Sequence, residues 1–156
     1  MKFVLCNLAT AKEAWASEVT ELYTKKISHF VPFEVQTLKA KKSSRDDADY
    51  KKKEESELIL KSLGKDDYVI LLDERGQVLD SIQFSKKIDQ ALGSSKKRVV
   101  FLIGGAFGVD NTIQQRAQFT WSLSKLVFPH MLVRLILAEQ VYRACTINRN
   151  EKYHHV

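Results

Sequence analysis

The chain has 156 residues, of which 44% are hydrophobic and 28% charged, and its formal net charge is +6 at pH 7. These values are typical of one soluble globular domain, and no apolar run approaches the roughly 20 residues that a membrane-spanning helix needs. The apolar stretch after Met1 is too short for a signal peptide and lacks a small-residue cleavage site, so we expect a cytoplasmic protein with no membrane partner.

Strand-like and helix-like segments alternate along the whole chain. Apolar runs or strict alternation predict strands, and apolar residues at helical spacing between start and stop signals predict helices. In chain order, the predicted elements are strand 3–8, helix 12–29, strand 33–38, helix 46–63, strand 68–73, helix 81–92, strand 99–103, helix 110–119, a strand with a loop at 121–128, and helix 129–148. This order predicts a single α/β domain with a mostly parallel sheet and helices on both faces.

The two cysteines, Cys6 and Cys145, lie far apart in the sequence, each among apolar residues. Free cysteine often behaves as a small buried hydrophobe, and cytosolic thiols stay reduced. We therefore expect two free cysteines in the core. A metal site needs more ligands at closer spacing, so no metal is predicted.

Three predicted strands end in residues that suit a ligand site: Leu72-Asp73, the glycine-rich stretch 104–108, and the stretch before Phe128-Pro129. In open α/β sheets, ligands bind outside the carboxyl ends of the strands. Glycines there let the backbone approach a ligand and offer it N–H groups. A purely structural turn explains these glycines equally well, because they do not form the dinucleotide-binding fingerprint.

The basic residues are unevenly distributed. Lys39, Lys41, Lys42 and Arg45 fall in a predicted loop, and 51–53 is a run of lysines between acidic residues. The excess of positive charge points to a polyanionic partner. Local pairing with the neighbouring acids is the simpler interpretation of the lysine run.

The last predicted helix is apolar almost all round from 131 to 137, with Arg134 as the exception. Such a helix is buried on several sides, so we expect a subunit interface. A buried arginine needs an anion, either a ligand or a structural carboxylate elsewhere. Glu139 and Arg143 are spaced to pair with each other along the helix.

The C-terminal motifs resemble those of one known family. Residues 121–130 read WSLSKLVFPH, and Arg134, the sequence EQVYRA at 139–144 and Tyr153-His154 follow. With Gly104, Gly105 and Gly108, this pattern resembles the ribosomal large-subunit pseudouridine methyltransferase H family of the SPOUT superfamily. The similarity in length and element order covers essentially the whole chain.

The resemblance implies a deep trefoil knot in the C-terminal half, an obligate homodimer, and S-adenosyl-L-methionine bound in the knot. It further implies methylation of N3 of a pseudouridine in 23S rRNA of the assembled ribosome. Carried over by position, the cofactor contacts fall on Leu72, Gly104, Gly105, Leu123, Ser124, Lys125, Leu126, Val127 and Phe128.

Methyl transfer from a sulfonium needs neither a metal nor a covalent nucleophile, so positioning of the two reactants carries most of the catalysis. The N3 proton must leave, and the His154 imidazole is a candidate acceptor near neutral pH. Tyr153 is a candidate for stacking on the base, and Arg134 or Arg143 for holding a phosphate or a base carbonyl. A structureless tail is the alternative for Tyr153 and His154, and His130 is interpreted as a helix-start residue.

Two other functions remain open from the sequence. A non-enzymatic ribosome-associated factor would bind RNA through the basic surface without cofactor affinity. A different nucleotide-binding enzyme, such as a dehydrogenase, would use Asp73 after the third strand, but the dinucleotide fingerprint is missing.

Overall fold

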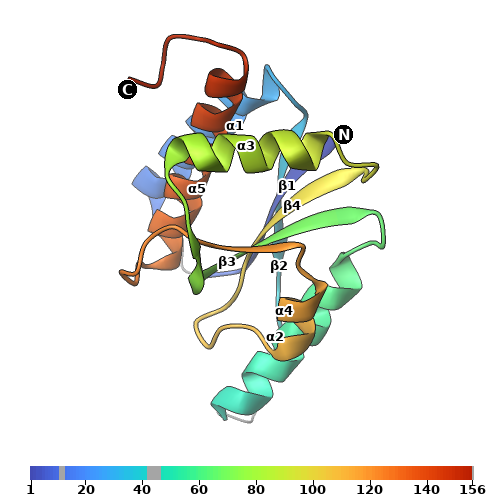
Figure 1. Cartoon of the computed structure of the whole chain (residues 1–156). Coiled ribbons are helices and arrows are strands. Elements are labelled where there is room, and N and C mark those ends of the chain that lie inside the picture. Colours follow the sequence, from blue (N-terminus) through green and yellow to red (C-terminus); the bar gives the residue numbers. More distant parts are fainter. Residues whose placement is uncertain (11–12, 42–46, 156) are drawn as a thin grey trace.

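Figure 1 shows the chain as a computed structural model, which describes residues 1–10, 13–41 and 47–155. In chain order the elements are β1 (Lys2–Leu8), α1 (Ala14–Ser28), β2 (Phe33–Leu38), α2 (Ala48–Ser62), β3 (Asp67–Val78), α3 (Ser81–Leu92), β4 (Arg98–Ile103), α4 (Asn111–Arg116), β5 (Phe119–Ser122) and α5 (His130–Asn148). The five strands form one sheet in the order β2-β1-β4-β3-β5. All four strand pairs are parallel, so the predicted α/β class and parallel sheet are confirmed.

The sheet is covered on both faces, as predicted. Because side chains alternate along a strand, Phe3 and Leu5 of β1 point to one face while Val4 and Cys6 point to the other. The first face packs against α1, α3 and α5 through buried residues such as Ile27, Phe84 and Leu137. The second face packs against α2 and α4 through Ile59 and Ile113 (Figure 1).

The predicted helix ends follow local capping chemistry. Asp80 and Gln83 form a reciprocal capping box at the start of α3, which has the predicted bounds. The Asp47 carboxylate accepts a 2.9 Å hydrogen bond from the Asp49 N–H at the start of α2. The predicted starts of the first and second helices at residues 12 and 46 lie outside the described residues.

Three predicted bounds around β5 were wrong, including the start of β5 itself, which is Phe119 instead of Trp121. β3 continues to Val78 instead of ending at Asp73, because its second half pairs with Trp121 and Ser122 after a register shift between Leu72 and Gln77. The fourth helix stops at Arg116 instead of Phe119, because Phe119 begins β5 and pairs with β3. In each case backbone pairing across the sheet overrides the local pattern.

The remaining sequence expectations have mixed outcomes. Cys6 and Cys145 are free and buried, as expected. Lys39 and Lys41 are exposed, whereas Lys42 and Arg45 lie outside the described residues. Among the described residues, no helix is long and apolar enough to cross a membrane. The trefoil knot stays a prediction.

Candidate active site

A hollow of about 420 Å³ opens at the carboxyl edge of the sheet. Three segments meet there: residues 71–75 in the middle of β3, 103–109 from the last residue of β4 onward, and most of 121–128 at the end of β5 and after it. His130 and Val133 of α5 and Lys52 of α2 complete the lining. Its volume lies within the range usual for small-molecule and cofactor sites. We call this hollow the carboxyl-edge pocket.

Eight of the nine predicted cofactor residues line the carboxyl-edge pocket. They are Leu72, Gly104, Gly105, Leu123, Ser124, Leu126, Val127 and Phe128. Lys125 is the ninth; it is exposed and does not contribute to the lining. Segments more than 50 residues apart in the sequence therefore meet at one site, and the contribution of Lys125 stays a prediction.

The pocket loops are shaped by their own hydrogen bonds. The Ser122 hydroxyl donates to the Ser124 carbonyl at 2.9 Å, and the Ser124 hydroxyl accepts from the Leu126 N–H at 3.0 Å. In the glycine loop, the Gly108 N–H donates to the Gly105 carbonyl at 3.0 Å. Gly108 has φ of 78°, a left-handed conformation that favours glycine.

Helix α2 braces the glycine loop, which the sequence pattern did not indicate. The Glu55 carboxylate packs against Gly105, and a methyl group added there would lie 2.9 Å from Glu55 Cδ. The Ser56 hydroxyl accepts a 3.1 Å hydrogen bond from the Asp110 N–H. Burial raises the pKa of Glu55, and the positive charge of Lys51 acts against that rise.

Two buried ring nitrogens that belong to lining residues have no hydrogen-bond partner among the described residues: Trp121 Nε1 and His130 Nδ1. Such orphaned groups call for an explanation, and a bound ligand is one. Burial, aided by the charge of nearby Arg134, lowers the pKa of His130, so its imidazole is neutral at neutral pH. The lining thus combines apolar side chains with polar groups that a ligand would satisfy.

The carboxylate of Asp73 is already engaged in the pocket rim. Arg75 donates to it from Nε at 3.0 Å and from Nη2 at 2.8 Å. These hydrogen bonds hold the pKa of Asp73 below its usual range, against the opposing effect of burial. Hydroxyl recognition by Asp73, which a dehydrogenase would need, competes with this pair. Among the described residues, no cluster of three or more His, Cys, Asp or Glu side chains is arranged to hold a metal ion.

Three of the four predicted catalytic residues form a separate cluster at the C-terminal end of α5. Arg143 donates to Glu139 Oε1 from Nε at 3.0 Å and from Nη2 at 2.5 Å, which confirms the expected pairing. Arg143 Nη1 lies 3.0 Å from His154 Nδ1, and the Tyr153 hydroxyl donates to Glu139 Oε1 at 3.0 Å. The tail therefore folds back on α5. We call Glu139, Arg143, Tyr153 and His154 the tail cluster.

The Tyr153 ring of the tail cluster makes an aromatic contact and a cation–π contact. The Tyr153 ring meets the Tyr142 ring edge to face with centroids 4.7 Å apart, and the Arg143 guanidinium lies 4.7 Å from the Tyr153 centroid. Burial, then hydrogen bonds with Tyr23 and Glu139, raise the pKa of Tyr153, so its hydroxyl stays protonated.

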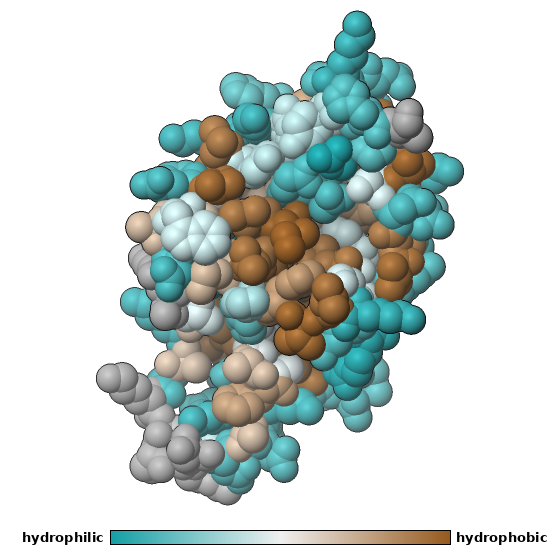
Figure 2. All heavy atoms as spheres, turned by 90° about the vertical axis from the view of Figure 1, so that its left-hand side faces the viewer, coloured by the Kyte–Doolittle hydropathy of each residue, from teal (hydrophilic) through white to brown (hydrophobic). Residues whose placement is uncertain are grey.

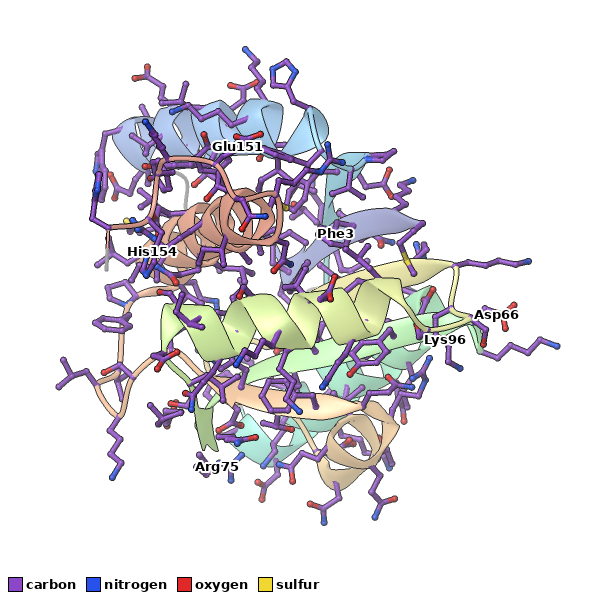
Figure 3. The ribbon with its side chains drawn as sticks, turned by 45° about the horizontal axis from the view of Figure 1, so that its top comes forward. Phe3, Asp66, Arg75, Lys96, Glu151 and His154 are labelled. Atoms are coloured by element: carbon purple, nitrogen blue, oxygen red, sulfur yellow. The ribbon has the colours of Figure 1, made fainter. Side chains whose placement is uncertain are left out.

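The tail cluster does not line the carboxyl-edge pocket of the same chain. Val133 at the pocket and Arg143 are ten positions apart along α5, a rise of about 15 Å. Figure 3 shows the same separation, with His154 near the end of α5 and Arg75 of the pocket rim well below it.

Arg134, the fourth predicted catalytic residue, lies in neither place. It donates to the Thr10 hydroxyl, and its Nε is buried without a partner among the described residues. Burial lowers the pKa of Arg134. It lines a groove of about 410 Å³ between α1, β2 and the start of α5, together with Met131, Phe33 and Val35. Within the described part of the chain, no carboxylate pairs with it at ion-pair distance.

The same side of the molecule carries an apolar surface. Figure 2 faces this side and shows hydrophobic side chains gathered at its centre. Trp15 and Leu22 of α1 and Val35 of β2 are 51%, 50% and 45% exposed. Residues 131–136 at the start of α5 are only half-buried, so the apolar helix that the sequence marked out is not fully covered within one chain.

Comparison with known proteins agrees with this architecture. A family model described as a predicted SPOUT methyltransferase matches residues 1–154. The chain belongs to the SPOUT methyltransferase family. Within this family, it is 60% identical to a protein of Bdellovibrio bacteriovorus, with 100% of both chains covered. It is 39% identical to a protein of Cytophaga hutchinsonii, over 99% of this chain and 100% of that one. Both relatives are named Ribosomal RNA large subunit methyltransferase H, so the family predicted from the C-terminal motifs is confirmed.

A solved structure shares the fold of this chain at low sequence identity. It is a probable methylase family protein from Haemophilus influenzae Rd KW20, with a TM-score of 0.52 and 11% identity. The match covers 95% of this chain and 66% of that one. At this identity the likeness concerns the fold alone.

Proposed function

We propose that this SPOUT methyltransferase transfers a methyl group from S-adenosyl-L-methionine to N3 of a pseudouridine in 23S rRNA. It acts as a homodimer on the assembled ribosome, in the cytoplasm. One observation carries the proposal: eight of the nine residues that the family pattern assigns to the cofactor line one pocket. Full-length relatives named as ribosomal RNA large subunit methyltransferases support the RNA substrate.

The carboxyl-edge pocket suits S-adenosyl-L-methionine in size and chemistry. Leu72, Leu123 and Phe128 supply apolar surface, and Gly104 and Gly105 allow close approach to the backbone. Trp121 Nε1 and His130 Nδ1 are free to bond with polar groups of the cofactor. When bound, the cofactor supplies its methyl group as an electrophile on a positively charged sulfur. The neutral His130 imidazole adds no repulsion to that charge.

The tail cluster supplies the groups that would handle the base. Tyr153 presents a protonated hydroxyl and an aromatic face, and Arg143 is held in place by Glu139. A guanidinium only donates, so His154 Nδ1 accepts from Arg143 and the ring proton of neutral His154 sits on Nε2. His154 can therefore take the N3 proton only after its Nδ1 is released from Arg143. The proton transfer and the docking of the tail are thereby coupled.

A second copy of the chain can bring a tail cluster next to a pocket, which one chain by itself does not do. While bound to Glu139 and Arg143, the tail stays about 15 Å along α5 from its own pocket. We propose that the homodimer uses the apolar side formed by α1 and the start of α5, and that the tail cluster of one subunit faces the pocket of the other. Arg134, with its unpartnered Nε on this side, then has access to an anion outside its own chain.

Calorimetry with S-adenosylhomocysteine tests the cofactor, and labelled methyl transfer to assembled ribosomes tests the substrate. We expect one cofactor product bound per chain and methylation of 23S rRNA. Deleting residues 153–156 should leave S-adenosylhomocysteine binding intact and remove turnover. Absence of binding, with or without ribosomes, would instead favour the non-enzymatic RNA-binding factor. Unchanged methylation by the truncated chain would exclude the tail from catalysis.

Mixed dimers test the shared site. One chain carries Tyr153→Phe and His154→Ala, and the other carries Gly105→Trp to block the pocket. Each homodimer should be inactive. If the tail serves the partner's pocket, random mixing restores about a quarter of wild-type turnover, because half of the dimers are mixed and each has one intact site. If the tail serves its own pocket, both sites of a mixed dimer are damaged and mixing restores nothing.

A further inference from the structure

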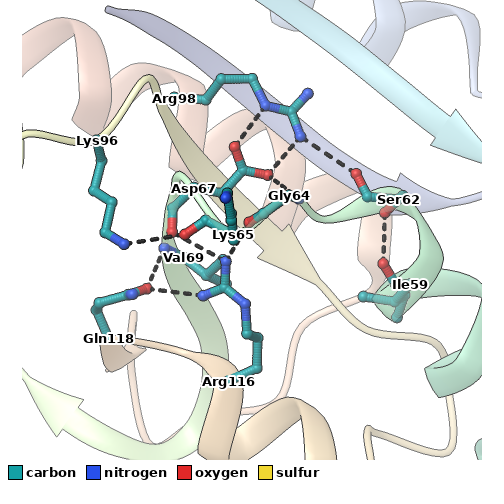
Figure 4. Close-up of polar contacts among 10 residues, drawn as sticks. All are labelled: Ile59, Ser62, Gly64, Lys65, Asp67, Val69, Lys96, Arg98, Arg116 and Gln118. Carbon is teal, nitrogen blue, oxygen red and sulfur yellow. Dashed lines mark hydrogen bonds and ion pairs between the residues drawn. The ribbon is translucent and has the colours of Figure 1, made fainter.

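A second hollow, of about 500 Å³, lies at the opposite edge of the sheet from the pocket. It is formed where β3 and β4 begin, by residues 61–67 together with Lys97 and Arg98. Figure 4 shows the polar contacts that shape it. We call it the amino-edge groove. Four of its lining residues are cations, Lys61, Lys65, Lys97 and Arg98.

The carboxylate of Asp67 does not neutralise the lysines of the amino-edge groove. Its side chain is only 4% exposed, and it accepts from Arg98 Nε at 2.8 Å, from Arg98 Nη2 at 2.6 Å and from the Gly64 N–H at 2.8 Å (Figure 4). The negative charge of Asp67 is thus balanced by Arg98, in a bidentate guanidinium–carboxylate pair to which the Gly64 N–H adds a third donor. The lysines around it therefore keep their own charge toward solvent.

Two further cations are fixed at the rim by backbone carbonyls. Arg116 Nη2 donates to the Gly64 carbonyl at 2.6 Å and to the Asp67 carbonyl at 3.1 Å, and Lys96 Nζ donates to the Lys65 carbonyl at 3.1 Å. These hydrogen bonds hold two further positive charges at the groove, and their acceptors are uncharged carbonyls that do not neutralise them. A preorganised guanidinium loses less conformational entropy when it binds an anion.

The opposing negative charge is small. Asp66 is 49% exposed and approaches Lys97 only to 3.8 Å, while the Lys97 side chain is 80% exposed. Among the described residues, neither Lys61 nor Lys65 forms an ion pair. An exposed ion pair of this kind contributes little to stability, so a phosphate can replace Asp66 as the partner of Lys97.

Helix α2 joins the two sites. Lys52 in its first turns lines the carboxyl-edge pocket, and Lys61 in its last turn lines the amino-edge groove. The two lysines are nine positions apart, which spans about 14 Å along the helix and is within the reach of a few nucleotides. An RNA strand that places its base at the mouth of the pocket, beside the cofactor, can therefore lay its backbone along α2 to the groove.

We propose that the amino-edge groove binds the sugar–phosphate backbone of the RNA substrate, away from the methylated base. This inference rests on the proposed function. Contacts to phosphate fix the position of a nucleic acid without reading its sequence, and clustered lysines and arginines are the side chains that make them. The groove thus positions the RNA, while the pocket and the tail cluster act on the base.

The test compares two variants with the same change in charge. Lys65→Gln/Lys97→Gln removes two exposed groove cations, and Lys86→Gln/Lys87→Gln removes two lysines of α3 that lie outside the groove, the pocket and the proposed subunit interface. Binding of a short RNA hairpin is measured against salt concentration, and KM and kcat are measured with assembled ribosomes. Losing two phosphate contacts should lower the slope of log affinity against log salt by about 1.4–1.8. We expect KM for the groove variant to rise about tenfold, with kcat and S-adenosylhomocysteine affinity near wild type.

The control variant should keep the wild-type slope and KM. Equal slopes for the groove and control variants would overturn the proposal. A raised KM on ribosomes with an unchanged slope on the hairpin would also overturn it, and would indicate a contact to a ribosomal protein. If the wild-type chain transfers no methyl group, the proposed function fails, while the slope on the hairpin still decides the role of the groove.

Discussion

The Tyr153 hydroxyl donates a 3.0 Å hydrogen bond to Oε1 of Glu139, the same oxygen that accepts from Arg143. One carboxylate oxygen therefore ties the C-terminal tail to α5 and orients the arginine beside it. The Tyr23 hydroxyl lies 3.4 Å from that of Tyr153, which links α1 to the same network. The conformation of the tail depends on this shared acceptor.

Tyr153→Phe should loosen the tail without disturbing the cofactor pocket. It removes a hydrogen bond to a charged acceptor, worth about 1.5–3 kcal/mol, while the edge-to-face packing on Tyr142 is kept. We expect kcat for ribosome methylation to fall about tenfold or more and S-adenosylhomocysteine affinity to stay within about twofold. Tyr142→Phe is the matched control, because it changes a neighbouring hydroxyl of the same aromatic group. Equal losses in both variants would argue against a specific role for the Tyr153 hydroxyl.

Gly105→Ala should weaken cofactor binding because the new methyl group meets the Glu55 carboxylate behind the glycine loop. The loop must shift into the pocket or Glu55 must move away. We expect S-adenosylhomocysteine affinity to fall about tenfold, or about 1.4 kcal/mol. Glu55→Ala removes the obstacle, so the double variant should recover most of the loss in a double-mutant cycle. Additive losses would show that Glu55 does not brace the loop.

Asp67→Asn should destabilise the fold by about 2–4 kcal/mol at neutral pH, because it leaves the partly buried Arg98 without its carboxylate. Burial acts to raise the pKa of Asp67, but hydrogen bonds from Arg98 and the Gly64 N–H outweigh it and lower that pKa. The unfolded chain then binds more protons than the folded one, so this stability is present above about pH 4 and is lost as pH falls through the lower folded pKa. Urea unfolding of the wild-type chain and of Asp67→Asn from pH 7 to pH 3 should show that the difference between their free energies of unfolding becomes smaller in acid. A constant difference would contradict the assignment.

Neither thiol should react in the folded protein. Burial raises the pKa of Cys145 to about 11, and burial also raises the pKa of Cys6. At pH 8 only about one Cys145 side chain in a thousand is then a thiolate, the form that reacts. Iodoacetamide should therefore modify no cysteine in the native state and both in denaturant, as read by mass spectrometry. Modification of the native protein would reveal local opening of β1 or α5.

Local sequence determined most of the secondary structure. The bounds predicted for β2 and α3 match the structure, because alternation after a proline and a capping box are decided by residues within a few positions of each other. The end of β3 and the start of β5 were not predictable in this way. The end of β3 depends on the pairing of Gln77 and Val78 with β5, and the start of β5 on the pairing of Phe119 with Ile70, all between residues that lie far apart in the sequence.

The candidate site shows the same distinction between features set by neighbouring residues and features set by distant ones. The glycine pattern and the C-terminal motif named seven residues of the pocket, since each motif is contiguous and carries its chemistry in its own residues, and Leu72 was carried over by position from the family resemblance. The brace between Glu55 and Gly105 was missed, because nothing in the sequence of a charged helix indicates which carboxylate will face a distant loop.

The sequence by itself determined the α/β class, the family and the residue types of the site, because periodicity, caps and motifs are local properties of the chain. Only the tertiary structure decided that Tyr153 and His154 bind Glu139 and Arg143 and stay apart from the pocket. It likewise decided that the Asp67 carboxylate pairs with Arg98 and does not neutralise the lysines of the amino-edge groove. Both outcomes depend on which distant groups satisfy one another's charge and hydrogen bonds, and that is settled only when the sheet brings them together.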